Sequence, residues 1–166
     1  MRCISRFWRE YDLVKNMITL DSQEFNTQPT SSQQSCIFLG NTNTGKSIDG
    51  SYLERCIKTG CKYLVFMTDD TPHEDMLHIH LLDENLDVID SATIGSMYST
   101  GFFRDYNIQE PNTLTFYFIG ETQWKVEILD KKAFLFPFIS QPKGVSRKNI
   151  FSQYFKIYGN PQSEVQ

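Results

Sequence analysis

The chain has 166 residues, of which 40% are hydrophobic and 22% are charged, the composition of an ordinary globular protein. Its 16 Lys and Arg residues against 20 Asp and Glu residues give a net charge of −4, which argues against a general binder of the nucleic-acid phosphate backbone. No apolar run approaches the roughly 20 residues of a membrane span, so we expect no membrane partner. The length is typical of one domain, and we predict a single domain over residues 1–166.

Hydrophobic spacing predicts a helix near each end of the chain. Apolar residues recur at three- and four-residue steps over 4–18, which is typical of an amphipathic helix. A polar loop, which can be mobile, is expected over 21–35. A short helix is expected over 52–57, followed by Gly60 as its left-handed cap. The second terminal helix is expected over 146–157, with Ser146 as its N-cap.

Strands are predicted between these helices. The apolar runs 36–39 and 63–67 indicate buried strands. Two hairpins are expected, one joining 76–82 to 86–94 and the other joining 114–119 to 124–129. Turns this short require antiparallel pairing. The predicted fold class is therefore α+β, with antiparallel β-sheets built of hairpins and an N-terminal and a C-terminal helix.

The cysteines are scattered and show no zinc-binding pattern. The domain is long enough to fold without cross-links, so we expect reduced thiols and a cytoplasmic location. The four residues are Cys3, Cys36, Cys56 and Cys61.

A nucleotide-binding motif is matched between residues 40 and 47. Gly40, Gly45, Lys46 and Ser47 fit the P-loop pattern, in which backbone N–H groups surround a phosphate and the lysine contacts the outer phosphates. Asp49-Gly50-Ser51 interrupts the helix that should follow, and the later hairpins do not suit a parallel P-loop core. A P-loop nucleotide-binding protein therefore stays an alternative.

The histidines His73, His78 and His80 fall in one window beside several carboxylates. His78 and His80 would share one face of a strand, where a metal site is conceivable. No recognised metal-binding spacing is present, so we expect no metal and no cofactor. We also find no catalytic set and predict that the chain is not an enzyme.

Charge is unevenly distributed along the sequence. No Lys or Arg occurs between Lys62 and Arg104, whereas eight acidic residues do, which predicts an acidic surface around the first hairpin. Such a surface accelerates association with a basic partner. The acidic residues are Asp69, Asp70, Glu74, Asp75, Asp83, Glu84, Asp87 and Asp90.

Two sets of aromatic residues are further candidates for binding. Phe102 and Phe103 lie in a polar connection, where adjacent aromatic side chains can anchor an interface. Trp124 beside Lys125, opposite Phe116 and Tyr117, would suit a sheet that binds single-stranded nucleic acid. This second function stays an alternative, and direct nucleic-acid binding is not part of the main prediction.

In size, acidity and antiparallel α+β pattern, the chain resembles the immunity proteins of bacterial contact-dependent growth inhibition systems. The resemblance rests on overall character and not on a motif. It implies binding and neutralisation of a cognate basic toxin domain, commonly a nuclease, by protein–protein contact. The acidic residues, with Phe102 and Phe103, would then form the partner-binding surface.

Overall fold

The computed structural model describes residues 16–69, 71, 75–95, 100–135 and 141–159, and in these residues every regular element is a β-strand. The strands are β1 (Met17–Leu20), β2 (Phe25–Pro29), β3 (Gln34–Leu39), β4 (Thr42–Asp49), β5 (Tyr52–Thr59), β6 (Lys62–Thr68), β7 (Leu77–Leu82), β8 (Val88–Ile94), β9 (Arg104–Gln109), β10 (Thr113–Tyr117), β11 (Gln123–Phe134), β12 (Val145–Arg147) and β13 (Ser152–Tyr158).

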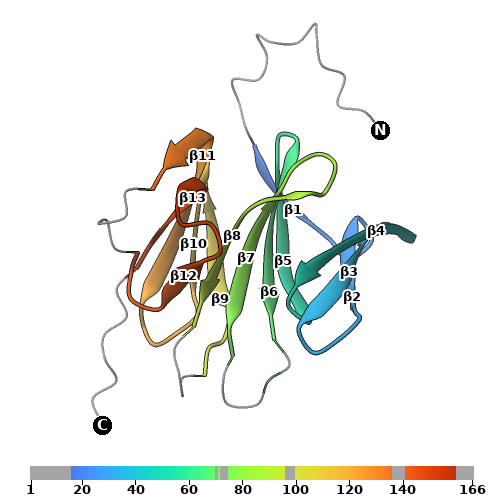
Figure 1. Cartoon of the computed structure of the whole chain (residues 1–166), viewed down its shortest axis with the longest axis horizontal. Helices are drawn as coiled ribbons and strands as arrows, with labels where there is room; N and C mark the ends of the chain where they lie inside the picture. Colours follow the sequence, from blue (N-terminus) through green and yellow to red (C-terminus); the bar gives the residue numbers. More distant parts are fainter. Residues whose placement is uncertain (1–15, 70, 72–74, 96–99, 136–140, 160–166) are drawn as a thin grey trace, which may run out of the picture.

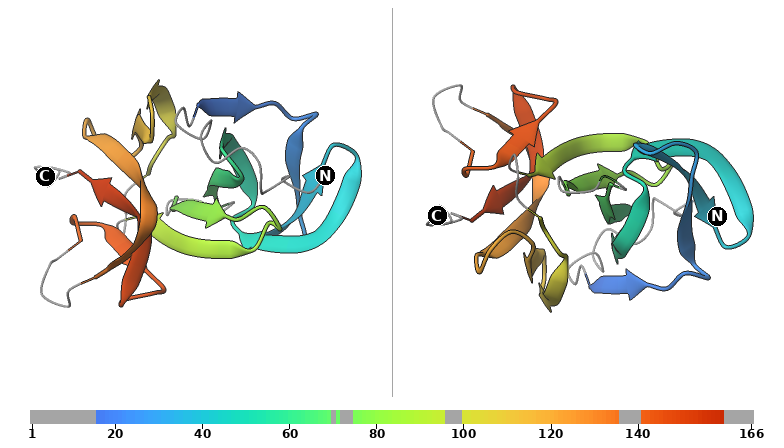
Figure 2. Two further views of the ribbon diagram at one scale, coloured as in Figure 1. Left: turned by 90° about the horizontal axis from the view of Figure 1, so that it is seen from above. Right: turned by 90° about the horizontal axis from the view of Figure 1, so that it is seen from below.

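The strands form three antiparallel sheets arranged in layers. A six-stranded sheet, in the order β1-β5-β6-β7-β8-β12, occupies the middle of the molecule (Figure 1). A four-stranded sheet, β13-β11-β10-β9, lies on one side of it, and a three-stranded sheet, β2-β3-β4, lies on the other. Views along the perpendicular direction show the same separation of the two outer sheets (Figure 2).

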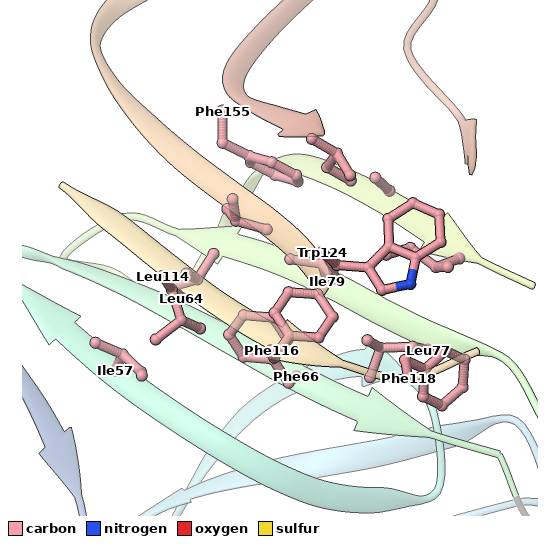
Figure 3. Packing of buried hydrophobic residues seen from close by; sticks show 14 of the residues in the cluster. Ile57, Leu64, Phe66, Leu77, Ile79, Leu114, Phe116, Phe118, Trp124 and Phe155 are labelled. Atoms are coloured by element: carbon pink, nitrogen blue, oxygen red, sulfur yellow. The ribbon is translucent and has the colours of Figure 1, made fainter. Parts of the chain in front are cut away.

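Side-chain alternation along the central strands fills two cores. In β6, Leu64 and Phe66 pack towards the four-stranded sheet, whereas Val65 and Met67 belong to the core beneath the three-stranded sheet. Successive side chains of a strand point to opposite faces, so β6 is hydrophobic without interruption. The larger core includes Phe116 and residues around it that are wholly buried (Figure 3).

Glycines at positive φ close two of the tight turns. Gly40 (φ 56°) connects β3 to β4, and Gly60 (φ 57°) connects β5 to β6, each in a two-residue turn. Glycine adopts this backbone conformation without the steric cost that a Cβ atom would impose. Gly60 was expected to cap a helix, but the same left-handed conformation serves a hairpin turn.

The expected α+β class is wrong, because the described residues contain no helix. The predicted helix over 52–57 is part of strand β5, whose Cys56 and Ile57 are both buried because the two faces of the central sheet are covered. The predicted helix over 146–157 is replaced by β12 and β13. Residues 1–15 of the predicted N-terminal helix lie outside the described residues, and Ile18 belongs to β1.

The C-terminal error arose because β13 fits both periodicities. Ile150, Phe151, Tyr154 and Ile157 have helical spacing, yet Ile150 and Phe151 are exposed. Within β13, buried Phe155 and Ile157 alternate with exposed residues, as in a strand with one covered face.

Two smaller expectations also differ from the structure. Residues 25–29 and 34–35, within the expected polar loop 21–35, are strand residues of the β2–β3 hairpin, where Phe25 is buried. Cys36 and Cys56 are free thiols, as expected, but Cys61 is disulfide-bonded.

Both predicted hairpins are confirmed, since β7 pairs with β8 and β10 pairs with β11, each antiparallel.

Candidate functional site: an acidic pocket at one end of the central sheet

The predicted acidic residues do not form one continuous surface. Asp69 and Asp75 lie at the end where β6 leads into β7, whereas Asp83, Glu84 and Asp87 lie at the β7–β8 turn. Strand β7 has six residues, so the two groups are separated by about 20 Å along the strand. Asp70 and Glu74 lie outside the described residues, as does His73.

The acidic residues of the β7–β8 turn have local structural partners. The Asp83 carboxylate accepts hydrogen bonds from the backbone N–H groups of Asn85 (2.9 Å) and Asp87 (3.0 Å), which stabilises the turn. The Asp87 carboxylate forms an ion pair with Lys46 on β4. Glu84 is exposed. This turn contributes negative charge, but two of its three carboxylates are already engaged within the chain.

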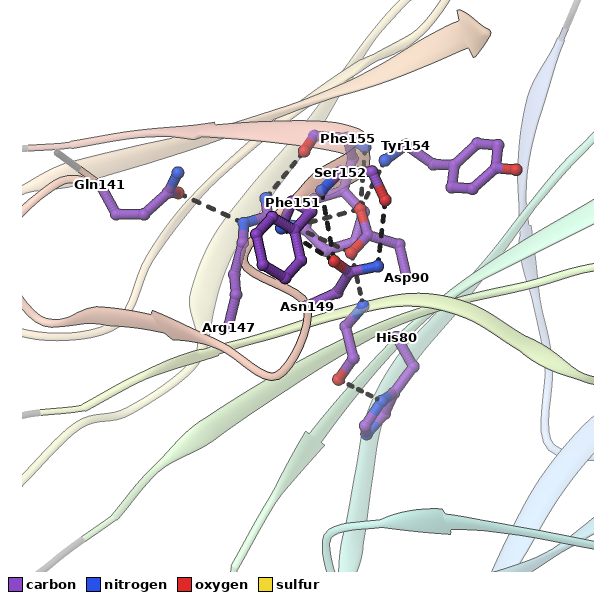
Figure 4. Close-up of polar contacts among 10 residues, drawn as sticks. His80, Asp90, Gln141, Arg147, Asn149, Phe151, Ser152, Tyr154 and Phe155 are labelled. Carbon is purple, nitrogen blue, oxygen red and sulfur yellow. Dashed lines mark hydrogen bonds and ion pairs between the residues drawn. The ribbon is translucent and has the colours of Figure 1, made fainter. Parts of the chain in front are cut away.

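Asp90 is buried and belongs to the interior of the protein. Its carboxylate oxygens lie 3.0 and 3.1 Å from Arg147 Nη1, and it also accepts hydrogen bonds from the backbone N–H groups of Tyr154 (2.6 Å) and Phe155 (3.2 Å) (Figure 4). The Asp90 and Arg147 side chains are 1% and 2% exposed. Asp90 therefore connects β8 to β12 and β13, and it is not accessible to a partner in this conformation.

The other group of acidic residues lines an open pocket of about 340 Å³, which we call the acidic pocket. Three carboxylates contribute to it, from Glu54, Asp69 and Asp75. Among the described lining residues there is no lysine or arginine. The pocket is bordered by Tyr52, Glu54, Thr68, Asp69, Thr71, Asp75, Gly101, Phe102 and Phe103.

The two adjacent phenylalanines at the acidic pocket have different environments. Phe102 is 72% exposed, whereas Phe103 is 7% exposed and stacks among Phe66, Phe116 and Tyr106 in the larger core. The backbone N–H of Phe102 donates to the carbonyl of Phe118, which fixes the segment on the four-stranded sheet. Phe103 thus anchors the segment, and Phe102 is left at the surface.

Hydrogen bonds hold two of the pocket carboxylates in place. The Thr68 hydroxyl lies 2.8 Å from Glu54 Oε1, and His78 Nε2 lies 2.9 Å from Asp69 Oδ2. The other oxygen of Asp69, Oδ1, is buried and has no hydrogen-bond partner among the described residues. His78 Nδ1 is in turn 3.2 Å from the Thr93 hydroxyl. The carboxylates are therefore positioned by neighbouring strands and not by a loop alone.

His78 and His80 do share one face of β7, as expected, with nearly parallel rings 6.1 Å apart. His80 Nε2 lies 2.9 Å from the carbonyl oxygen of Asp49, and Nδ1 lies 3.1 Å from the Ser91 hydroxyl. Burial lowers the pKa of His80 to about 4, so its ring is neutral at pH 7. Within the described part of the chain, no group of three His, Cys, Asp or Glu residues could hold a metal ion.

The P-loop string forms a β-hairpin. Gly40 lies in the turn, and Gly45 (φ 72°) lies at an irregularity in β4, where the Thr44 hydroxyl donates to the carbonyl of Ile37. Ser47 pairs with Cys36 on β3. A P-loop surrounds a phosphate at the start of a helix, whereas here the chain continues as a strand. The aromatic platform is also not formed at the surface, since Trp124 and Phe116 are buried.

Tyr52 and Glu54 are pocket residues that the sequence pattern did not indicate. Both were assigned to a helix, and only their place on β5 brings them beside residues 69 and 75. A β5–β6 hairpin prediction at Gly60 would have identified them, because Tyr52 pairs with Thr68, directly before Asp69.

No protein family, curated protein or solved structure compared with the chain matches it. Among the described residues there is no helix with the length and hydrophobicity needed to span a membrane.

Proposed function

We propose that the chain is a non-catalytic binding protein that neutralises a basic protein partner by direct contact, as immunity proteins of contact-dependent growth inhibition systems neutralise a toxin domain. The observation that carries this proposal is the acidic pocket, which combines three carboxylates with the exposed rings of Tyr52 and Phe102. Exposed aromatic residues beside uncompensated charge are typical of protein interfaces.

The two acidic groups would have different roles in binding. Glu54 and Asp75 would contact the partner in the acidic pocket, so their loss should mainly accelerate dissociation. The turn with Asp83 and Glu84 would act at longer range by attracting a basic surface, so its loss should mainly slow association. A basic nuclease domain is the partner that this arrangement suits best, because its own substrate is an anion.

The first experiment is affinity purification of the full chain from its native cells at low and high salt, followed by mass spectrometry. A single basic protein recovered in stoichiometric amount would then be tested by binding kinetics. We expect E54Q/D75N to weaken binding at least tenfold, about 1.4 kcal/mol. The charge-matched control at the β7–β8 turn, E84Q/D87N, also removes two negative charges and should change mainly the association rate.

An affinity that does not change in E54Q/D75N would contradict the role of the acidic pocket. A partner with no basic surface, or an association rate that is insensitive to salt, would contradict the proposed electrostatic recognition. The cytoplasmic location stays a prediction, and the disulfide at Cys61 argues against a strongly reducing compartment.

A further inference from the structure

We propose that the acidic pocket receives one arginine side chain of the partner. This inference rests on the proposed function and names the chemical group that the pocket recognises. The pocket offers carboxylates and aromatic rings, and a guanidinium ion binds both. It donates hydrogen bonds to carboxylates in a planar, bidentate manner, and it stacks on aromatic faces. Lysine has a compact, strongly hydrated charge that matches carboxylates less specifically.

Several aromatic rings elsewhere in the described residues have a cation of the same chain over them. Six such pairs occur among the described residues, with Arg or Lys groups between 4.1 and 5.8 Å from the ring centroids. In this part of the chain no cation lies over the rings of Tyr52 and Phe102, although these residues are 52% and 72% exposed. These two rings are therefore available to an external cation.

The carboxylates of the acidic pocket also have no Lys or Arg partner among the described residues, although Asp69 contacts His78. The sequence has no Lys or Arg between Lys62 and Arg104, and this interval supplies Asp69 and Asp75. The nearest arginine in sequence to Glu54, Arg55, lies over the ring of Tyr106 and donates to the Glu54 carbonyl oxygen. Its guanidinium is thus engaged beside the pocket, and among the described residues no arginine forms an ion pair with the pocket carboxylates.

The size of the pocket fits the proposed ligand. A volume of about 340 Å³ accommodates a side chain with its apolar stem, and the lining mixes carboxylates with aromatic rings in the way that such a side chain needs. Glu54 and Asp75 are only partly buried, so they supply the carboxylate oxygens that a ligand in the pocket can reach. An arginine supplies five N–H donors.

The test is a two-dimensional NMR titration of the uniformly ¹⁵N-labelled full chain with acetyl-arginine-methylamide and, separately, acetyl-lysine-methylamide. We expect the arginine derivative to shift the amide signals of Tyr52, Glu54 and Phe102 in a saturable manner. Its dissociation constant should be at least fivefold lower than that of the lysine derivative. Two variants, F102A and E54Q, should each weaken arginine binding at least threefold.

Matched controls use residues on other parts of the surface. F134A removes a ring that is 82% exposed on β11, and D87N removes a carboxylate at the β7–β8 turn, and both should leave the titration unchanged. Equal affinity for the two derivatives would overturn arginine recognition but leave the proposed function intact. Absence of pocket shifts with either derivative would also overturn it, whereas the partner-binding kinetics of E54Q/D75N test the proposed function separately.

Discussion

The buried ion pair between Asp90 and Arg147 allows a sharp prediction about stability. Asp90 accepts hydrogen bonds from Arg147 and from the backbone of Tyr154 and Phe155, and Arg147 Nη2 donates to the carbonyl of Phe155 at 2.7 Å. The guanidinium also lies 4.5 Å from the centroid of the Phe155 ring. D90A would leave the guanidinium and two backbone N–H groups buried without this acceptor.

The expected loss of unfolding free energy in D90A is about 3–5 kcal/mol, the usual cost of removing one partner from a buried pair. Burial lowers the pKa of Arg147, and the Asp90 carboxylate opposes this shift, so its removal makes the buried cation still less favourable. With a urea dependence of about 2 kcal/mol per molar, the unfolding midpoint should fall by about 2 M.

Equilibrium unfolding in urea, followed by tryptophan fluorescence, measures this change. D87A is the matched control, because the Lys46–Asp87 pair is exposed and its loss should cost less than about 1 kcal/mol. A second variant, D90L/R147M, removes both charges and should be more stable than D90A. If D90A lost less than about 1 kcal/mol, the network would not hold β13 against β8 as we argue.

Three further predictions concern single buried groups. His80 has a pKa of about 4 in the folded chain and 6.5 in the unfolded chain, so the free energy of unfolding should fall by about 3 kcal/mol as the pH falls from 6.5 to 4. Urea unfolding of H80N at a series of pH values should show most of this pH dependence lost. Gly50 has φ 109°, and an added Cβ would lie 2.4 Å from the Cβ of Met67, so G50A should lower the free energy of unfolding by about 2–4 kcal/mol. At Gly60 an added Cβ would meet nothing within 4 Å, so G60A should lower it by only about 1–2 kcal/mol. Similar losses in the two variants would contradict the steric argument. Burial raises the pKa of the Cys56 thiol far above its usual range, so Cys56 should react with a disulfide reagent only after unfolding, and rapid reaction in native buffer would contradict its placement.

The hairpins were predictable from sequence because their signals are local. Alternating or continuous apolar runs on either side of a short polar turn require antiparallel pairing. The register was less predictable, because a turn over 120–123 would place Ile119 opposite Trp124, whereas Phe116 pairs with Trp124. The terminal elements were not predictable in this way. A strand such as β13, with Phe155 and Ile157 buried, carries too few residues for its period to exclude a helix.

The acidic pocket could be predicted only in part. The absence of Lys and Arg over one interval drew attention to Asp69 and Asp75, which line the acidic pocket, but the sequence did not distinguish these two residues from Asp83 or from buried Asp90. That separation depends on strand length and on which face each residue of β8 occupies. Glu54 and Phe102 come from distant segments, and their proximity depends on how the sheets pack.

The layered fold itself restricts where this protein can present charge. Both faces of the central sheet are covered, so polar residues within its strands, such as His80 and Asp90, must find partners inside the protein. Strands β6 and β7 contain no exposed residue, so exposed groups beside them lie where these strands end. Because Asp83 and Asp87 are engaged at one end, we propose that a partner binds at the other end, where Glu54 and the exposed Phe102 line the same pocket.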